Sequence, residues 1–530
     1  MPRSLTTGDT PLKLSDDFAI RLNIPNPPDD VVAAVVATKA QLRDDTFQRL
    51  VVGRAAADTA TIAHASVLQS LSISLTDHAV VRPIATEAIA PFEFRSESYH
   101  LNIPHDGRQA TLTANSTLGL FRGLTTFTQM WYGSSGGKYL LDAPIDIVDT
   151  PAFLNILYWH VADSQSFPLQ TATFPELAEK GAYSATEIYS ISDVQRVVSY
   201  ANERGIDVVM ELDSPGHTTG IAFAHPEHIA CANKSPWATY ANEPPAGQLR
   251  IASNATLAFA RQLFDSVAGM LAGTMMSSGG DEVNLPCWND DEETARDLSD
   301  RNMTIADALN QFIQEVQGVL HDHGKTPFIK SDMILTHNVP VTNDTIAVVW
   351  QSSADAVSMA ERGQRFIHQP SDYFYLDCGA GEWLGSDVLG NSWCDPFKTW
   401  QRAYSFDPYA NLTASQQSLV LGGQMPIWSE QTSPENLDSI VWPRLASGAE
   451  VFWTGATLPD GTSRLGTLFL SVSISEPSYV NWLGANATSG TQAFNRINEL
   501  RYRLVDRGIK AIALQPHWCV LRPGECDLNA

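Results

Sequence analysis

The 530-residue sequence contains no apolar run of about 18 residues, the length that a membrane-spanning helix needs, so we expect no such helix. Basic residues are also few: 34 Lys and Arg stand against 59 Asp and Glu, for a formal net charge of −25. This balance argues against nucleic acid or an anionic membrane surface as a partner. The opening residues 1–14 hold no apolar segment, and we predict no secretory signal peptide there.

Cysteine is scarce, and its spacing does not match that of zinc ligands. The six cysteines fall in three close pairs, which fits three disulfides, with six buried free thiols as the alternative. The pairs are Cys231 with Cys287, Cys378 with Cys394, and Cys519 with Cys526. Seven N-x-Ser/Thr sequons accompany them and also favour a secreted protein. We hypothesise that a signal peptide once preceded the present start.

Residues 1–145 have the pattern of a separate α+β domain. The Ala- and Val-rich residues 31–50 predict a helix, and a second, amphipathic helix is expected at 118–131. Alternating apolar and polar residues predict strands at 67–75, 98–103 and 109–114.

Residues 146–530 form the second predicted domain, in which strand and helix patterns alternate. The candidate strands are 155–161, 207–213, 274–278, 327–330, 345–350, 365–368 and 419–428. Helices are expected between them, for example at 191–204, 255–272, 305–323 and 354–362. Repeated βα units predict a parallel sheet, and so many of them predict an α/β barrel of the (β/α)8 type.

The stretch Thr274–Asn284 delivers two adjacent carboxylates, Asp281 and Glu282, after one of these strands. That is the end at which (β/α)8 enzymes carry their chemistry. Gly279 and Gly280 allow the backbone to bend and to approach a ligand closely. Neighbouring residues on an extended chain point to opposite sides, so the two acids can hold different roles. An Asp-Glu pair alone is equally typical of a solvated surface.

Five motifs, in chain order, resemble those of the family 20 glycoside hydrolases, the β-N-acetylhexosaminidases. They are Trp159–Pro168, Glu211–His217, Gly279–Asn284, Ser371–Cys378 and Gly422–Glu430. The resemblance covers nearly the whole chain and implies a TIM barrel preceded by a small α+β domain. The first βα unit of that barrel, about 30 residues, is predicted to be missing between Phe153 and Leu154. Such a gap would expose two sheet edges unless the accessory domain fills it.

The resemblance implies substrate-assisted catalysis, in which the 2-acetamido oxygen of the sugar is the nucleophile. Glu282 would act as general acid and then as general base, and Asp281 would hold the acetamido N–H. His217 would connect Asp163 to Glu282 and tune the proton affinity of that acid. The alternatives are a surface acid for Glu282, a backbone-bonded histidine for His217 and a loop cap for Asp163.

The same resemblance implies a set of sugar-binding residues. Trp350 and Trp428 would wall the acetamido group and stack on the pyranose ring. Tyr375 would donate a hydrogen bond to the acetamido oxygen, while Asp377 and Glu430 would bind hydroxyl groups. Aromatic residues at strand ends are more often core than ligand, and that alternative stays open for the two tryptophans.

The sequence departs from the family pattern at three places. Ser277 stands where a histidine is common, and Lys330 stands where a tryptophan usually walls the acetamido pocket. The missing unit would carry the arginine that binds the hydroxyls of the terminal sugar, a contact worth about 1.5–3 kcal/mol. We therefore expect a lower catalytic efficiency than that of an intact relative.

The resulting prediction is an exo-acting β-N-acetylhexosaminidase that removes terminal β-linked GlcNAc or GalNAc from chitin oligomers or glycans with retention. A catalytically weak or inactive glycan-binding relative is the alternative. An endo-acting chitinase-like hydrolase is a third reading, whose spaced acidic motif is not found. No cofactor and no metal are expected. The resemblance implies an extracellular or secretory location, and a homodimer is left open.

Overall fold

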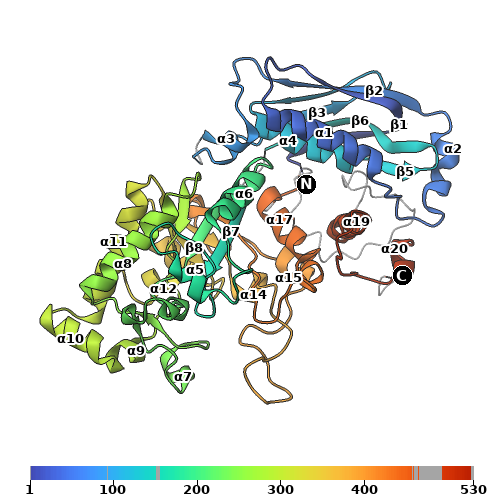
Figure 1. The fold of residues 1–530 in the computed structure, drawn as a ribbon. Coiled ribbons are helices and arrows are strands. Elements are labelled where there is room, and N and C mark those ends of the chain that lie inside the picture. Colours follow the sequence, from blue (N-terminus) through green and yellow to red (C-terminus); the bar gives the residue numbers. More distant parts are fainter. Residues whose placement is uncertain are drawn as a thin grey trace.

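The computed structural model describes residues 2–91, 94–150, 155–455, 457–458, 464 and 492–526. Within them, a six-stranded sheet and a seven-stranded sheet are the two large β structures. Figure 1 shows the first sheet, from the N-terminal part of the chain, above the second. A two-stranded ribbon, β9 (Ile229–Ala230) with β10 (Gln248–Leu249), lies on a loop of the second part.

The N-terminal sheet has the strand order β1-β2-β4-β3-β6-β5. Its strands are β1 (Ser4–Leu22), β2 (Ser66–Leu75), β3 (Tyr99–Ile103), β4 (Ala110–Ala114), β5 (Tyr132–Ser134) and β6 (Gly137–Asp149). Helices α1 (Asp29–Asp44) and α4 (Thr117–Gln129) lie on the side of this sheet that faces the rest of the molecule (Figure 1). The predicted α+β architecture is confirmed.

Two details of this part differ from the prediction. Helix α1 ends at Asp44 instead of continuing to residue 50, and Asp45 pairs with Arg507 at 2.8 Å. Helix α4 begins one residue early, where the Ser116 hydroxyl accepts a hydrogen bond from the Gly119 amide at 3.0 Å. Such a cap satisfies one of the free amides of the first turn. Smaller helices are η1 (Arg54–Asp58), α2 (Thr59–Ile62) and α3 (Ile84–Ala88).

The second sheet is parallel throughout and has the order β15-β14-β13-β12-β11-β8-β7. Its strands are β7 (Ile156–Ala162), β8 (Asp207–Leu212), β11 (Met275–Ser277), β12 (Thr326–Lys330), β13 (Ile346–Val349), β14 (Phe366–His368) and β15 (Val420–Gly423). All seven predicted strands are therefore present. The last one was predicted to reach Trp428 and ends at Gly423, because its neighbour β14 ends at His368 and Pro426 has no amide proton to donate.

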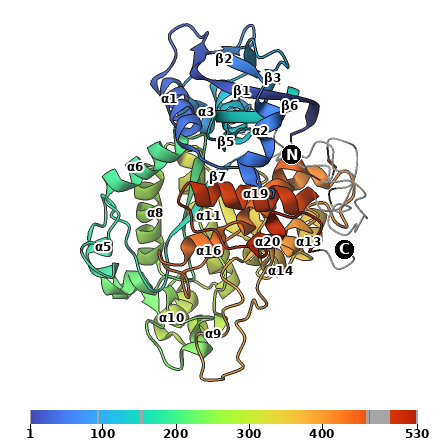
Figure 2. The same cartoon turned by 90° about the vertical axis from the view of Figure 1, so that its right-hand side faces the viewer.

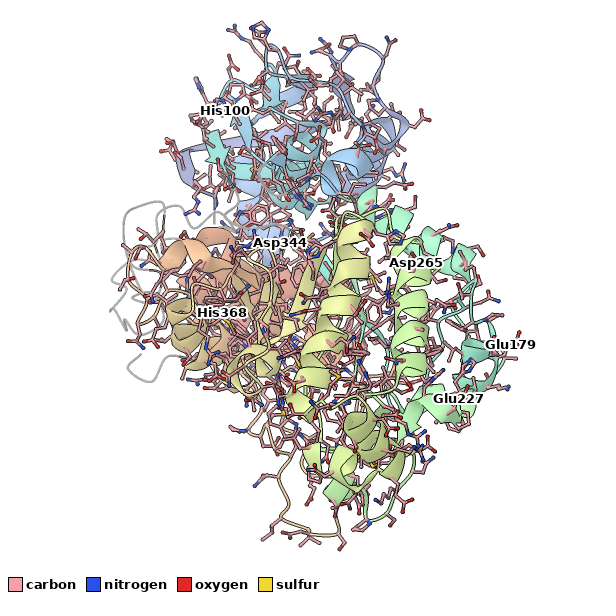
Figure 3. The ribbon with its side chains drawn as sticks, turned by 90° about the vertical axis from the view of Figure 1, so that its left-hand side faces the viewer. His100, Glu179, Glu227, Asp265, Asp344 and His368 are labelled. Atoms are coloured by element: carbon pink, nitrogen blue, oxygen red, sulfur yellow. A yellow bond between two sulfur atoms is a disulfide. The ribbon has the colours of Figure 1, made fainter. Side chains whose placement is uncertain are left out.

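The helices expected between these strands are also present. They are α6 (Ile191–Asn202), α8 (Asn254–Ala268), α11 (Ile305–Asp322) and α13 (Asp355–Glu361). Helices α6 and α11 each begin with a capping box, formed by Ser190 with Asp193 and by Thr304 with Asp307. Helices α8 and α11 lie side by side on the outside of the sheet (Figures 1 and 3) and bury their apolar faces against it.

The remaining helices among the described residues lie on the connecting loops and on the C-terminal side. They are α5 (Glu176–Gly181), η3 (Thr219–Phe223), η4 (Pro226–His228), α7 (Trp237–Tyr240), α9 (Leu285–Asp290), α10 (Glu292–Asp300), α12 (Ser331–Leu335), α14 (Ser371–Phe374), α15 (Trp400–Tyr404), η5 (Gln417–Leu419), α16 (Leu437–Val441), α17 (Arg444–Thr454), α19 (Gln492–Asp506) and α20 (His517–Val520).

Among the described residues, β7 and β15 are the two edges of the barrel sheet and do not pair with each other. Strand β7 leaves two apolar side chains exposed at its start, Ile156 at 37% and Leu157 at 43%. The predicted gap in the barrel thus coincides with an exposed edge. The proposed junction between Phe153 and Leu154 lies outside the described residues, so the deletion itself stays a prediction.

Side chains of the N-terminal domain form hydrogen bonds at the beginning of this edge strand. Arg95 donates to the carbonyls of Asn155 (3.3 Å) and Gly205 (3.0 Å), and Arg122 donates to Gly205 at 2.6 Å. The buried carboxylate of Glu97 accepts from Arg122 at 2.6 Å and from the Asn155 amide at 3.0 Å. The N-terminal domain therefore anchors the start of β7 without adding a described strand to it.

Helix α19 joins the two parts a second time (Figures 1 and 2). On one side, Glu499 accepts from the Tyr132 hydroxyl at 3.1 Å, and Arg503 donates to the Trp131 carbonyl at 3.1 Å. On the other side, Ile497 packs against Trp400 of α15. These contacts tie the accessory sheet to the helices behind β15.

Candidate active site

The acid pair lies on a tight turn that follows β11. Gly279, Gly280 and Glu282 all have positive φ values, of 69°, 104° and 57°. A Cβ built on Gly279 would lie 2.0 Å from Oδ1 of Asp213, so only glycine fits there. The sequence predicted that glycine allows a ligand to approach here. At Gly279 the close neighbour is instead the carboxyl group of Asp213. Glu282 is not on extended backbone, because its φ lies in the left-handed region.

Glu282 is held by a histidine that also contacts Asp163. Oε2 of Glu282 lies 3.3 Å from Nε2 of His217, whose Nδ1 lies 3.1 Å from Oδ1 of Asp163. Burial alone would lower the pKa of His217, but Asp163 and Glu282 raise it well above the ordinary value. Burial likewise opposes ionisation of Asp163, yet the His217 charge holds its pKa far below the usual range. His217 and Asp163 therefore form an imidazolium–carboxylate pair next to Glu282.

Asp281 is buried, with 6% of its surface exposed. Its Oδ2 lies 3.2 Å from Nζ of Lys330, and its carboxylate also shares a hydrogen bond with the Asp213 carboxyl group. Burial opposes its ionisation, but the charges of Lys330 and His217 lower its pKa. Burial and the Asp281 charge together raise the pKa of neighbouring Asp213 well above normal. Asp281 therefore presents an ionised acceptor, and Asp213 keeps its proton.

Glu211, which the sequence analysis did not single out, is the centre of a buried network below the acid pair. It accepts from the Tyr158 hydroxyl at 2.5 Å, the Ser277 hydroxyl at 2.6 Å and Nδ1 of His160 at 2.7 Å. Nζ of Lys330 lies 3.3 Å from the same carboxylate. The signal for it was a glutamate inside the wholly buried strand β8. Two of the three departures from the family pattern, Ser277 and Lys330, are thus partners of one carboxylate.

Three of the predicted sugar-binding aromatics gather beside the acids. Trp350 follows β13, Tyr375 follows α14, and Trp428 lies on the loop after β15. Tyr375 stacks on Trp350 with ring centroids 6.5 Å apart and is tilted against Trp428 at the same distance. The exposed Trp393 meets both Trp350 and Tyr375 edge-on, at 5.8 and 5.5 Å. Burial raises the pKa of Tyr375 well above normal, so its hydroxyl remains a donor.

Asp377 and Glu430 lie at the rim of this aromatic cluster. Oδ1 of Asp377 accepts from the Trp428 amide at 3.4 Å, and burial raises its pKa. Glu430, two residues beyond Trp428, is exposed and lies within electrostatic reach of Asp377 and Asp163. The structure therefore brings all nine residues predicted for catalysis and sugar binding to one end of the barrel sheet.

Donor atoms of Asp163, His217 and Glu243 also lie within 4.8 Å of one another, a spacing that suits a metal ion. An imidazolium has no lone pair for an ion, and His217 is held in that form by its carboxylates. Burial, assisted by the Asp163 charge, raises the pKa of Glu243 to about 7. The contacts of His217 with Asp163 and Glu282 suit a proton relay here.

The three predicted cysteine pairs each form a disulfide: Cys231–Cys287, Cys378–Cys394 and Cys519–Cys526. The first joins the loop after β8 to α9, behind the acid pair. The second closes a loop of sequence separation 16 directly after Asp377 and packs against Trp350 and Tyr375. The alternative of six free thiols is excluded.

We expect removal of the Cys378–Cys394 bridge by a double Cys→Ser substitution to weaken sugar binding. The bridge restrains a loop of about 15 residues, which corresponds to a stabilisation of roughly 3 kcal/mol. If half of this free energy were lost from sugar binding, KM would rise about tenfold. Initial rates against substrate concentration measure the effect. The matched control removes Cys519–Cys526, far along the chain; an equal rise of KM in that variant would contradict a local role.

The site combines an acid held by an imidazole–carboxylate pair, a second carboxylate and a group of aromatic rings. This combination is typical of a glycoside hydrolase. Sequence comparison places the chain within that class: it belongs to glycosyl hydrolase family 20, whose catalytic-domain model matches residues 144–456. A second family model, described as beta-acetyl hexosaminidase like, matches residues 1–130.

Similar proteins come from fungi, insects and bacteria. A beta-hexosaminidase of Arthroderma benhamiae is 31% identical over 481 residues, which cover 82% of this chain and 74% of that protein. A chitooligosaccharidolytic beta-N-acetylglucosaminidase of Bombyx mori is 31% identical over 479 residues, 81% of this chain and 74% of that one. The solved β-N-acetylhexosaminidase of Streptomyces coelicolor shares the fold, with a TM-score of 0.65, 19% identity and 97% coverage of both chains.

Proposed function

We propose that this chain is an exo-acting β-N-acetylhexosaminidase that releases terminal β-linked GlcNAc or GalNAc from chitin oligomers or glycans. The observation that carries the proposal is the buried, ionised Asp281 beside a Glu282 that His217 holds. A buried carboxylate is stabilised by each hydrogen-bond donor that a ligand brings to it. The N–H of a 2-acetamido group is a donor of the required kind.

The reaction follows from these groups. The acetamido oxygen attacks the anomeric carbon as Glu282 donates its proton to the leaving oxygen, which breaks the glycosidic bond. The ring that forms is an oxazolinium, and Asp281 stabilises its positive charge through the N–H. Water then attacks the same carbon from the opposite face, Glu282 takes its proton, and the acetamido group is regenerated. Two inversions give net retention.

The remaining residues would position the sugar. Trp350 and Trp428 supply apolar walls, and the protonated Tyr375 donates to the acetamido oxygen and turns it toward the anomeric carbon. Asp377 and Glu430 are suited to sugar hydroxyls because they lie at the open rim. Asp163 would keep His217 charged and oriented.

A catalytically weak relative is the second candidate, and Lys330 favours it. Its ammonium lies 3.2 Å from Asp281 and 5.4 Å from the Trp428 ring. It therefore neutralises part of the charge that should stabilise the oxazolinium. The predicted loss of one βα unit acts in the same direction, because it would remove a sugar-binding arginine.

We further propose a catalytic domain of residues 146–530 and an accessory domain of residues 1–145. None of the described helices is long and apolar enough to span a membrane. The three disulfides favour folding in an oxidising compartment, so we propose an extracellular or secretory location.

The proposal is tested with 4-nitrophenyl N-acetyl-β-glucosaminide and with chitin oligomers. We expect release of nitrophenol, release of monosaccharide from the chain end, and strong inhibition by a thiazoline analogue of the oxazolinium. Binding of oligomers without any turnover would instead support the inactive relative. Shortening of chitin from the middle of the chain would support an endo-acting hydrolase.

Asp281→Asn is expected to lower kcat by about a hundredfold, because the amide cannot offset the developing positive charge. KM should change much less, since the effect belongs to the transition state. Steady-state kinetics separate the two, and Asp300→Asn, at the exposed end of α10, is the matched control. Full activity of Asp281→Asn would contradict the role of Asp281 in substrate-assisted catalysis.

A further inference from the structure

A second cluster of chemically capable side chains lies on the loop between η3 and α7, away from the acid pair. His225, Glu227 and His228 offer one donor atom each, and these atoms all lie within 4.8 Å of one another. Nδ1 of His225 is 3.2 Å from Oε1 of Glu227, and Nε2 of His228 is 3.9 Å from the same oxygen. Ligand atoms around a tetrahedral zinc ion are about 3.4 Å apart, given bonds of about 2.0–2.2 Å.

The outer nitrogen of each ring already has a partner on another element. Nε2 of His225 lies 2.9 Å from Oε1 of Glu176, the first residue of α5. Nδ1 of His228 lies 3.1 Å from the hydroxyl of Thr256 in α8. Metal-binding histidines almost always make such an outer contact, which sets the tautomer and turns the other nitrogen toward the ion. The remaining nitrogens, Nδ1 of His225 and Nε2 of His228, are the two that face Glu227.

Packing holds both rings in place. His228 stacks on Phe259 with centroids 4.4 Å apart, and His225 contacts Phe259 and Phe174 at 5.2 and 5.6 Å. Arg250 is the nearby cation, but it is engaged by Asp291 at 3.0 Å.

We propose that His225, Glu227 and His228 bind a divalent transition-metal ion, with Zn²⁺ the best match to two imidazoles and a carboxylate. The Glu227 side chain is 60% exposed and lies at the periphery of the molecule (Figure 3), so water completes the coordination. The ion would connect the loop that begins at His217 to α5 and α8. Its role is structural, since no substrate group reaches this face in the proposed reaction.

The test is calorimetric titration of Zn²⁺ into the full-length protein after chelator treatment. We expect one site of micromolar or tighter affinity and a rise of the melting temperature on loading. Co²⁺ in place of Zn²⁺ should give the visible absorption of a tetrahedral site. Absence of binding by the unaltered protein, or binding without the Co²⁺ bands, would overturn the proposal.

Variants locate the ion. Glu227→Gln changes an exposed side chain, which leaves folding intact, and should weaken binding at least tenfold, as should His228→Gln. Glu176→Gln should weaken it about 10- to 100-fold through the outer contact. His323→Gln is the matched control, because His323 is a surface imidazole paired with Asp265 at 2.8 Å and belongs to none of the clusters of three ligand atoms found among the described residues. Equal affinity in Glu227→Gln and His323→Gln would refute the site.

Discussion

Glu282→Gln is expected to reduce kcat/KM about 10²- to 10⁴-fold, the range that a positioned general acid contributes. The amide is nearly isosteric and can still bond to His217, but it has no proton of the required acidity to give. The loss should be larger for chitin oligomers than for the 4-nitrophenyl glycoside, because nitrophenolate leaves with little protonation. This dependence on the leaving group separates an acid from a residue that only shapes the pocket.

The control for this variant is Glu292→Gln, an exposed glutamate in the first turn of α10 that should leave both rates unchanged. Circular dichroism melting checks that each variant folds. A Glu282→Gln enzyme that keeps more than half of its activity, or that loses the two substrates equally, would remove Glu282 from the role of acid.

Most of the barrel could be predicted because its signals are local. Strand β13, for example, was predicted at 345–350 and runs from Ile346 to Val349, since a short buried apolar run between turns has few other interpretations. Helix α11 was predicted from its apolar spacing and is capped at Thr304, where the sequence already shows a hydroxyl followed by an acid.

Strand β1 could not be predicted in the same way. Its 19 residues include Gly8, Pro11 and an acidic pair, which have little intrinsic preference for a strand. What holds it is pairing with β2 and with β6, and the β6 partners follow it by more than 120 residues. The register also shifts along both ladders, so no simple alternation of apolar residues marks it.

The candidate site, too, could be predicted from the sequence only in part. The acid pair, His217 and the aromatic residues follow from motifs that lie after successive strands, and parallel strands bring their carboxyl ends together. The bonds among Glu211, Ser277 and Lys330 are set by three different strands meeting inside the barrel. The sequence showed Ser277 and Lys330 only as departures from a family pattern, whereas the structure makes them partners of the same buried carboxylate.

Lys330→Met is expected to destabilise the protein by about 3–5 kcal/mol near neutral pH, because it strips two buried carboxylates of their cation. Lys330 is 1% exposed, and its Nζ lies 3.3 Å from Glu211 and 3.2 Å from Asp281. Burial alone would lower the pKa of Lys330, but the two acids raise it well above 10.5. With about 2.1 cal/mol/K of unfolding entropy per residue over the 530 residues, the melting temperature should fall by about 3–4.5 °C.

The pH dependence of this loss has a definite sign. The pKa of Lys330 is raised, so its contribution is complete below its unfolded value of 10.5 and disappears as the pH rises through the folded value. The pKa values of Glu211 and Asp281 are lowered, so their contributions are present above the unfolded values of 4.5 and 3.8 and disappear as the pH falls through the folded ones. The cluster is therefore fully charged between about pH 5 and 10, and the penalty of Lys330→Met should be largest there.

Melting curves of Lys330→Met and the unaltered protein from pH 3 to 9 test this directly, with Lys180→Met, an exposed lysine of α5, as control. The gap between the two curves should begin to narrow as the pH falls below about 4, because the unfolded chain then takes up protons at these carboxyl groups. The double variant with Asp281→Asn should lose less than the sum of the single changes, since the second substitution removes one of the uncompensated charges. Additive losses and a pH-independent gap would mean that the ammonium is not the partner of these acids.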